Sequence, residues 1–400
     1  MRLAFACAFA AAAALTATLH SAPLGKYVVT GVSITDLGTL GGSDSVARDI
    51  NNNGTVVGWS KIGIGLKHAF IAYPRLAMSD LGSSFAPNES EANGVNNVNV
   101  AVGAWWVPGH ASEPHAAHWD GFGISMAQVI DPDVAEDCQY GSRANAINDT
   151  GTVTGWIGLV KDLAPSDPSV CIMGGSAAQW VSPSLPSLLT ANVLSSEGLD
   201  VSDNGVFVGR DVMVSFKATR WSNGVATSIL PAPNGTGFHY GSGVAYGVNN
   251  LGRVVGYFDH GFDGSSTAKA HAFYWNGSSA RSTDLGTLLN DGLSVAREIN
   301  EQGFVAGYAN KVNKLPVPNA FGYIRNAGFI WHPDFGMKAL PQLPASQLTD
   351  ACEAYALNDR KSDNGLIQVV GYCAVDGKRR AVRWNVTTAR SAPVCPTPTC

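Results

Sequence analysis

The sequence predicts an all-β protein: a seven-bladed β-propeller with four antiparallel strands per blade, closed by an N-terminal strand that completes the last blade. Three observations predict this fold. The pattern A-x-x-[IV]-N-[ND]-x-G-x-V-x-G-[WY] recurs seven times, at steps of 45 to 64 residues. Each repeat holds short runs rich in Val, Ile and aromatic residues, bounded by Gly, Asn and Ser, as strands are. The motif T-D-L-G-T-L occurs both inside the repeats and before the first of them.

The conserved half of each repeat predicts two strands joined by a tight turn, and A-x-x-W follows after a variable gap. The seven halves are Ala47–Trp59, Ala92–Gly103, Ala144–Trp156, Gly198–Gly209, Ala245–Tyr257, Ala296–Tyr308 and Ala354–Tyr372. The glycine before the aromatic residue predicts a bulge or a close backbone approach. The tryptophans at one register predict packing between blades, and they are Trp119, Trp180, Trp221, Trp275, Trp331 and Trp384.

The fifth repeat shows the four expected strands in order. They are 244–248, 253–257, 271–275 and 283–288, and Asn249 to Gly252 form the turn between the first two. The seventh repeat ends after its third strand, at Trp384. The surplus strand Thr35–Leu40 is therefore expected to pair near Ala381–Asn385 and close the ring, which removes exposed sheet edges.

The combined motif resembles the HAF-repeat family of predicted extracellular bacterial proteins. The resemblance rests on Ser45–Gly58, on His68-Ala69-Phe70 and His271-Ala272-Phe273, and on Asp284–Leu288. It covers nearly the whole mature chain, and the H-A-F part is degraded in the second, third, fourth and seventh copies. The resemblance implies export and a repeat fold, and it implies no activity and no functional residues.

The N-terminus has the layout of a secretory signal. Arg2 is followed by the apolar run Leu3–Leu15 and by small residues through Ala22. We therefore expect three segments: a signal peptide over 1–22, one propeller over 27–390 and a short Cys/Pro tail over 391–400. The mature protein is expected to be secreted or periplasmic, monomeric and without a membrane span. Nucleic acid is excluded as a partner because the net charge is -5 and no basic run exists.

Six cysteines remain after removal of Cys7, which lies inside the apolar run. An even number in an oxidising compartment favours disulfides, and no zinc-like spacing is present. The predicted pairs are Cys138 with Cys171, Cys352 with Cys373, and Cys395 with Cys400. In repeats three and seven the first cysteine is expected before the first strand and the second after the second strand.

The loops after the second and fourth strands vary widely in length, and in a propeller both sets emerge on the same face. Loops carry function on rigid scaffolds, although the same variation is equally expected of tolerated insertions. Aromatic and polar side chains concentrate in these loops, which is the general make-up of a small-ligand site. The candidate ligand-binding residues are Trp105, Trp106, His110, Arg210, Asp211, His239, Tyr240, Asp259, His260 and Asp263.

These observations favour a binding module that recognises an extracellular glycan or a protein surface. We expect no cofactor, because no known nucleophile, phosphate-binding or zinc motif occurs. We expect no metal site either, because His115 and His118 lie on opposite faces of one strand. The alternative is a glycoside hydrolase or lyase whose carboxylates come from several blades, such as Asp137, Glu197, Asp211, Asp259 and Glu353. A purely structural surface protein is a third, weaker reading.

Overall fold

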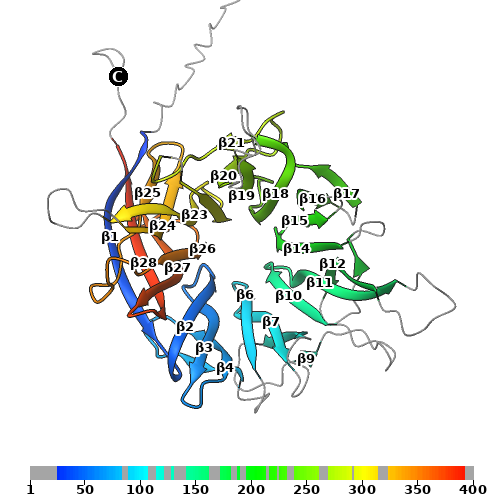
Figure 1. The fold of residues 1–400 in the computed structure, drawn as a ribbon, viewed down its shortest axis with the longest axis horizontal. Coiled ribbons are helices and arrows are strands. Elements are labelled where there is room, and N and C mark those ends of the chain that lie inside the picture. Colours follow the sequence, from blue (N-terminus) through cyan, green and yellow to red (C-terminus); the bar gives the residue numbers. More distant parts are fainter. Residues whose placement is uncertain are drawn as a thin grey trace, which may run out of the picture.

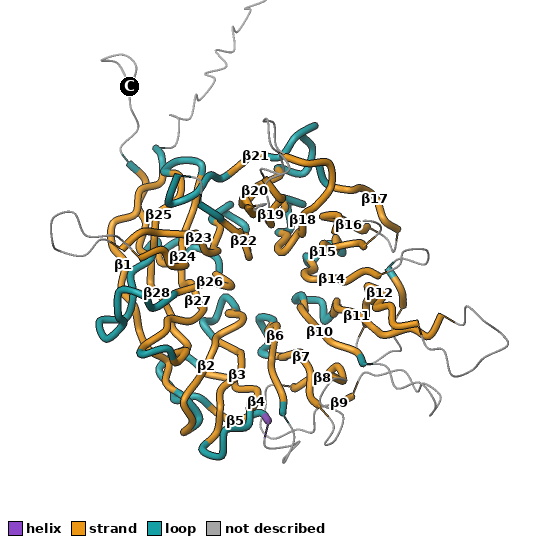
Figure 2. Tube along the Cα trace, in the orientation of Figure 1, coloured by secondary structure: helices purple, strands orange, loops and turns teal. Residues whose placement is uncertain are grey.

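The computed structural model describes residues 25–82, 89–106, 114–120, 128–129, 141–161, 172–181, 187–189, 195–212, 216–222, 225–231, 238–260, 269–290, 292–313 and 323–391. Seven four-stranded antiparallel sheets follow one another around a central axis in chain order (Figure 1). Strands and short connections make up most of this part of the chain (Figure 2). The predicted seven-bladed propeller is therefore confirmed.

Four strands at increasing distance from the axis form each blade. The innermost strands are β2 (Gly41–Ile50), β6 (Ser90–Val95), β10 (Ser142–Ile147), β14 (Ser195–Val201), β18 (Phe238–Val248), β22 (Ser294–Ile299) and β26 (Cys352–Leu357). The second strands are β3 (Val56–Ile62), β7 (Val100–Trp106), β11 (Thr152–Lys161), β15 (Val206–Val212), β19 (Val254–His260), β23 (Val305–Asn313) and β27 (Leu366–Val375). The third strands are β4 (Lys67–Ala72), β8 (Pro114–Asp120), β12 (Ile172–Val181), β16 (Phe216–Ser222), β20 (Lys269–Trp275), β24 (Tyr323–His332) and β28 (Lys378–Arg390). The outer strands are β5 (Ser79–Asp80), β9 (Gln128–Val129), β13 (Ser187–Leu188), β17 (Val225–Ile229), β21 (Thr283–Asp284), β25 (Gly336–Ala339) and, in the last blade, β1 (Tyr27–Gly38).

The N-terminal strand closes the ring, as predicted. β1 pairs antiparallel with β28, so that Thr35 lies opposite Arg383 and Gly38 opposite Ala381. The strand is longer than expected at its start and ends at Gly38, whose φ of 86° leaves the extended region.

The outer strand of blade five is shorter than expected. The fourth strand of blade five was expected over 283–288, but β21 holds only Thr283 and Asp284. Leu285 still donates its N–H to the carbonyl of Ala272 and is buried. Gly286, with φ of 74°, then turns the chain away from the sheet. In the motif D-L-G, the strand therefore ends at Asp284, Leu285 packs into the core and Gly286 redirects the chain.

The glycine of the second strand marks a close backbone approach, as predicted. A Cβ built on Gly256 would lie 1.9 Å from the carbonyl oxygen of Val244 on the neighbouring strand. The same clash occurs in all seven blades, at Gly58, Gly103, Gly155, Gly209, Gly256, Gly307 and Gly371. No side chain fits there without moving backbone.

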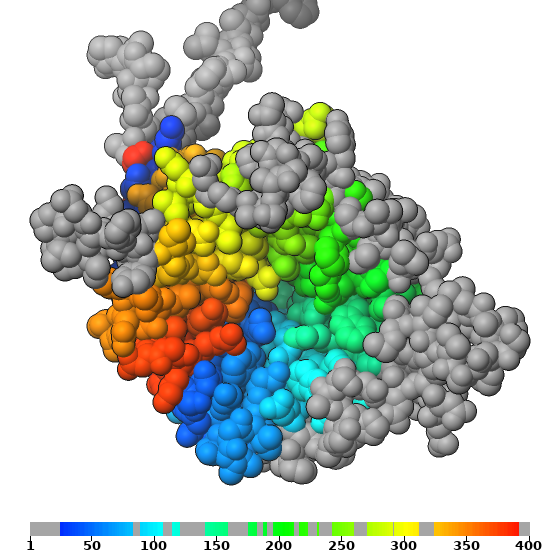
Figure 3. Space-filling model, viewed as in Figure 1, coloured from blue at the N-terminus to red at the C-terminus, as the bar shows by residue number. Residues whose placement is uncertain are grey.

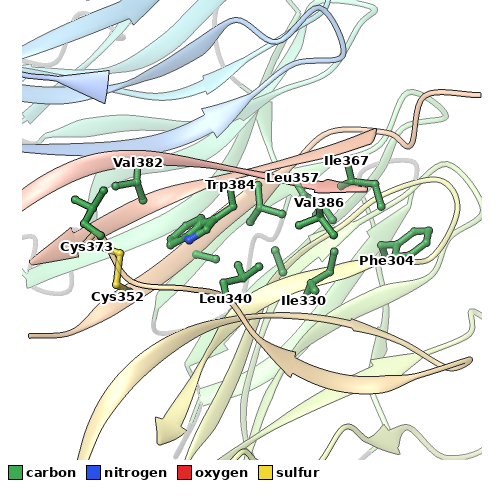
Figure 4. Packing of buried hydrophobic residues seen from close by; sticks show 14 of the residues in the cluster. Phe304, Ile330, Leu340, Cys352, Leu357, Ile367, Cys373, Val382, Trp384 and Val386 are labelled. Atoms are coloured by element: carbon green, nitrogen blue, oxygen red, sulfur yellow. A yellow bond between two sulfur atoms is a disulfide. The ribbon is translucent and has the colours of Figure 1, made fainter. Parts of the chain in front are cut away.

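The recurrent tryptophan packs between blades. All six copies are at most 8% exposed, and Trp180, Trp221 and Trp384 are essentially inaccessible. Figure 4 shows Trp384 of the last blade beside Leu340, which follows β25 of the blade before it. Burial of an aromatic ring of this size between sheets is a main source of stability in such a fold.

The tight turns between first and second strands are joined into a closed ring of hydrogen bonds, here called the turn rim. In each blade the backbone N–H of one rim residue donates to the side-chain oxygen of the next, at 2.7–2.9 Å. The rim residues are Asn52, Asn97, Asp149, Asp203, Asn250, Glu301 and Asp359. The last bond runs from Asp359 to Asn52, so the first and last blades are joined on this face as well.

Cys352 and Cys373 form the predicted disulfide. They lie directly opposite each other on β26 and β27, within the strands rather than just outside them as expected. In five other blades a serine stands at the position of Cys352 and accepts a backbone N–H from the preceding blade. The other two predicted pairs lie outside the described residues and stay predictions.

Removal of this disulfide is expected to lower the free energy of unfolding by about 2–4 kcal/mol. The variant Cys352→Ser/Cys373→Ala restores the serine of the other blades and leaves no free thiol at the site. Urea unfolding of this variant and of the parent under non-reducing conditions measures the difference. Equal midpoints would show that the bond contributes nothing to stability.

The disulfide fits a protein that matures in an oxidising compartment. Among the described residues, no helix is long and apolar enough to cross a membrane. The proposed signal peptide over 1–22 and the tail over 392–400 lie outside the described residues.

Candidate functional site

A cavity of about 480 Å³ lies on the propeller axis and is lined by residues from the innermost strand of every blade. In the space-filling view the described residues of the blades succeed one another around this centre from blue to red (Figure 3). Each innermost strand runs from the variable-loop end of the axis to the turn rim. Positions along it therefore mark successive levels of the cavity.

One level of the cavity is formed by seven β-bulges. In every blade the pairing between first and second strands skips one residue of the first strand. The seven skipped residues all line the cavity, and we call them the bulge ring: Arg48, Asn93, Asn145, Leu199, Tyr246, Arg297 and Tyr355. A bulge redirects a side chain out of the regular alternation of a strand, so this geometry presents seven side chains to one axial space.

The aromatic and arginine members of the bulge ring lie together on one side of the axis. From blade five to blade one, four consecutive members stack as Tyr246, Arg297, Tyr355 and Arg48. The Arg297 guanidinium carbon lies 4.0 Å from the centre of the Tyr246 ring and 5.1 Å from that of Tyr355. The Arg48 guanidinium carbon lies 5.2 Å from the same Tyr355 ring. We call these four residues the aromatic–arginine arc.

Aromatic residues of the second strands extend this arc. Tyr257 lies 6.1 Å from Tyr246, and Tyr372 lies 6.0 Å from Tyr355, between ring centres. Burial raises the pKa of Tyr257 to about 12, with further contributions from Tyr246 and other neighbours. Burial likewise raises the pKa of Tyr355 and Tyr372. These three phenols stay protonated at neutral pH and present flat rings, and the Tyr355 hydroxyl donates to Glu353 at 2.9 Å.

On the side of blades two to four, the charges at or beside the cavity are paired. Lys67 forms an ion pair with Glu91 at 3.0 Å, and Arg143 contacts the same carboxylate. Arg210 pairs with Glu197 at 2.7 Å. Burial lowers the pKa of Lys67 to about 8, although Glu89 acts in the opposite direction. Each cation on this side has an acidic partner supplied by the protein.

Three carboxyl groups occupy the next level toward the turn rim: Asp49, Asp200 and Glu298. Asp49 accepts the N–H of Val95 at 2.8 Å, and Asp200 accepts that of Val248 at 2.7 Å. Both bonds cross to the following blade. Two of these groups are therefore clamps between blades.

Burial raises the pKa of all three groups, and it is the largest cause in each. The pKa of Asp49 rises to about 6 and that of Asp200 to about 7. Burial raises the pKa of Glu298 well above its ordinary value, and the negative charges of Asp200 and Asp49 raise it further. The three groups thus share one electrostatic environment on the axis.

The structure brings one of the predicted ligand-binding residues, Arg210, into this cavity. Trp106 lies at the end of β7 with the Lys67 ammonium 4.2 Å from its ring, and Trp105 packs against His115. Asp211 is buried inside blade four, where burial raises its pKa to about 6.

The remaining predicted residues are less fully described. Asp259 lies on β19, partly exposed, opposite Ala270. His239, Tyr240 and His260 belong to β18 and β19, but their side chains are outside the described part. His110 and Asp263 lie outside it altogether.

The residues missed at the level of sequence are the bulge ring and the carboxyl level beneath it. They occupy the two unspecified positions of A-x-x-[IV]-N, between residues that repeat in nearly every blade. Variation at a fixed place inside a repeated motif was the available signal. Variable loop lengths, by contrast, point to the face on which the loops emerge.

Within the described ranges no group of three or more His, Cys, Asp or Glu side chains is arranged to hold a metal ion. Burial lowers the pKa of His118, which favours its neutral form. The residues on the axis are suited to binding through stacking, hydrogen bonds and charge.

No family model matches the chain, and no curated protein matches its sequence. Among solved structures, it is similar to a protein of unknown function from Dyadobacter fermentans, with 11% identity, a TM-score of 0.43 and coverage of 91% of this chain and 100% of that one. It is also similar to a mutant of AofleA from Arthrobotrys oligospora, with 11% identity, a TM-score of 0.36 and coverage of 78% of this chain and 90% of that one. A third similar structure is an ulvan lyase of polysaccharide lyase family PL25, with 11% identity, a TM-score of 0.36 and coverage of 71% of this chain and 80% of that one. At such low TM-scores these likenesses carry no inference about the ligand or activity of this chain.

Proposed function

We propose that this chain is an exported binding module that recognises an extracellular carbohydrate at the variable-loop end of the propeller axis. The observation that carries the proposal is the aromatic–arginine arc. Four side chains in contact, one from each of four consecutive blades, face one cavity, at positions where the repeat pattern does not specify the residue. Flat aromatic faces with a few polar groups that fix orientation are the general make-up of a small-ligand site.

The acidic residues of the turn rim favour entry of a ligand from the opposite, variable-loop end of the axis. The turn rim carries four acidic residues, Asp149, Asp203, Glu301 and Asp359, and all of them already bond to neighbouring turns. The arc lies on the other side of the carboxyl level, toward the variable loops. A ligand that reaches the arc from that end does not cross the rim.

A hydrolase or lyase remains the second candidate, because Asp49, Asp200 and Glu298 do meet in one cavity. Two of them hold backbone N–H groups of the following blade, however, which ties them to the architecture. Burial raises the pKa of Glu298 well above its ordinary value, which is the direction that a general acid needs.

A panel of polysaccharides and oligosaccharides, read for both binding and cleavage, tests the proposal. The variant Tyr246→Ala/Tyr355→Ala is expected to weaken binding of the best ligand by about fivefold to a hundredfold, since each lost stacking contact contributes about 0.5–1.5 kcal/mol. The variant Trp106→Ala/Tyr240→Ala/His260→Ala tests three of the residues predicted from the sequence in the same way. Leu188→Ala, an exposed apolar residue on β13, is the control. Unchanged binding by both multiple variants would place the site elsewhere, and cleavage that depends on Glu298 would favour the enzyme.

A further inference from the structure

Two arginines of the arc have no ion-pair partner among the described residues. In the described part of the chain, neither Arg48 nor Arg297 forms an ion pair or a side-chain hydrogen bond, and Arg48 Nε is buried without a partner. Both side chains are partly buried on the axis. An unpaired guanidinium in such a place leaves donor groups unsatisfied, which costs free energy.

Other arginines that line the same cavity do have ion-pair partners. Arg143 has Glu91 and Arg210 has Glu197, at the same cavity. Arg48 and Arg297 are instead held by stacking on Tyr355 from the two blades that flank it. These contacts hold both guanidinium groups beside the Tyr355 ring, with no side-chain hydrogen bond to another described residue.

The nearby carboxyl groups do not neutralise these arginines. Asp49 follows Arg48 in the chain, but its oxygens accept the N–H groups of Ile50 and Val95. Glu298 follows Arg297, and its Oε1 accepts the N–H of Ile299. Glu353 interacts with both arginines through its charge, but its oxygens accept the Tyr355 hydroxyl and the Asn326 side-chain N–H, and it forms no ion pair with either. The protein therefore supplies two guanidinium groups beside one tyrosine and no ion-paired acid for either.

We propose that Arg48 and Arg297 together bind the acidic group of a sugar, a carboxylate or a sulfate ester, whose ring stacks against the arc. The ligand class is accordingly an acidic oligosaccharide. This inference rests on the proposed carbohydrate-binding function and narrows it. A guanidinium matches both anions through paired N–H donors, which an ammonium or amide cannot reproduce.

The test uses the whole mature protein and isothermal titration with three probes of equal length: an oligogalacturonate, its fully methyl-esterified neutral form and a sulfated galactan oligosaccharide. The parent is expected to bind at least one acidic probe at least about tenfold more tightly than the neutral one. The variants Arg48→Gln and Arg297→Gln should each weaken that binding by about tenfold or more. The preference between the two acidic probes identifies the anion as carboxylate or sulfate.

Arg281→Gln, at an exposed turn outside the cavity, is the matched control and should bind as the parent does. Thermal unfolding checks that each variant is folded. Should a glutamine variant not fold, Arg48→Lys/Arg297→Lys keeps both charges and is still expected to lose most of the affinity. Equal affinity of the parent for the neutral and acidic probes would overturn the acidic class while leaving carbohydrate binding in place. Binding of none of the probes, with no hit in the wider panel, would overturn both.

Discussion

A chain that begins at Thr39, and therefore lacks β1, is expected to lose its cooperative folded state or to unfold with far less denaturant than the parent. β1 forms ten residue pairs with β28 and is the outermost strand of the last blade. Tyr27 of β1 is buried, with its ring centre 5.0 Å from that of Phe304 in blade six. Loss of Tyr27 and of the partly buried Val29, Ile34 and Leu37 removes roughly 5 kcal/mol of apolar burial, comparable with the total stability of many domains.

A circular permutant separates closure of the ring from loss of sequence. Arg390 at the end of β28 lies opposite Tyr27 at the start of β1, and the N–H of Ser391 donates to the carbonyl of Lys26. A chain that starts at Thr39 and carries residues 26–38 after Ser391 through a short Gly/Ser linker can therefore form the same strand pair. Urea unfolding should show that the permutant regains most of the stability that the truncated chain loses. A truncated chain as stable as the parent would mean that the ring does not need β1.

Residues whose role depends on their own strand or turn were predictable. Gly256 and the tryptophans repeat at fixed registers because every blade needs the same close approach and the same filling between sheets. The strand β1 was predictable because a surplus motif at one end of the chain matched a missing strand at the other. Both predictions need only a comparison of the repeats with one another, which the sequence alone allows.

The candidate site was not predictable in the same way. Tyr355 stacks with Arg48, more than 300 positions earlier in the chain, and with Arg297 from the preceding blade. Their meeting depends on closure of the ring and on a bulge in each innermost strand, and A-x-x-[IV]-N does not show the bulge. Likewise Asp49 and Asp200 look like ordinary polar residues until the axis places them in one buried level.

That carboxyl level is expected to make the protein less stable at pH 8 than at pH 5. The pKa of Asp49 in the folded protein is about 6 and that of Asp200 about 7, against about 3.9 in an unfolded chain. The folded state therefore binds more protons than the unfolded state between these values. Stability from these groups is full below about pH 4 and is lost as the pH rises through 6 and 7.

The effect should be large because Glu298 shifts in the same direction. Each proton held only by the folded state changes the free energy of unfolding by about 1.4 kcal/mol per pH unit, so a total loss of roughly 3 kcal/mol between pH 5 and pH 8 is expected after allowance for water in the cavity. Asp200→Asn keeps one oxygen to accept the N–H of Val248, replaces the oxygen that accepts the N–H of Val201 and cannot ionise, so it should flatten this pH dependence. Asp363→Asn, which alters an exposed carboxylate outside the cavity, should leave the slope unchanged.

Calorimetric melting of the parent and both variants between pH 5 and pH 8 measures how the free energy of unfolding changes with pH. A parent that gains stability toward pH 8, or an Asp200→Asn variant with the parent's slope, would show that these carboxyl groups are ionised on the axis at low pH, and the binding cavity would then be an anionic one.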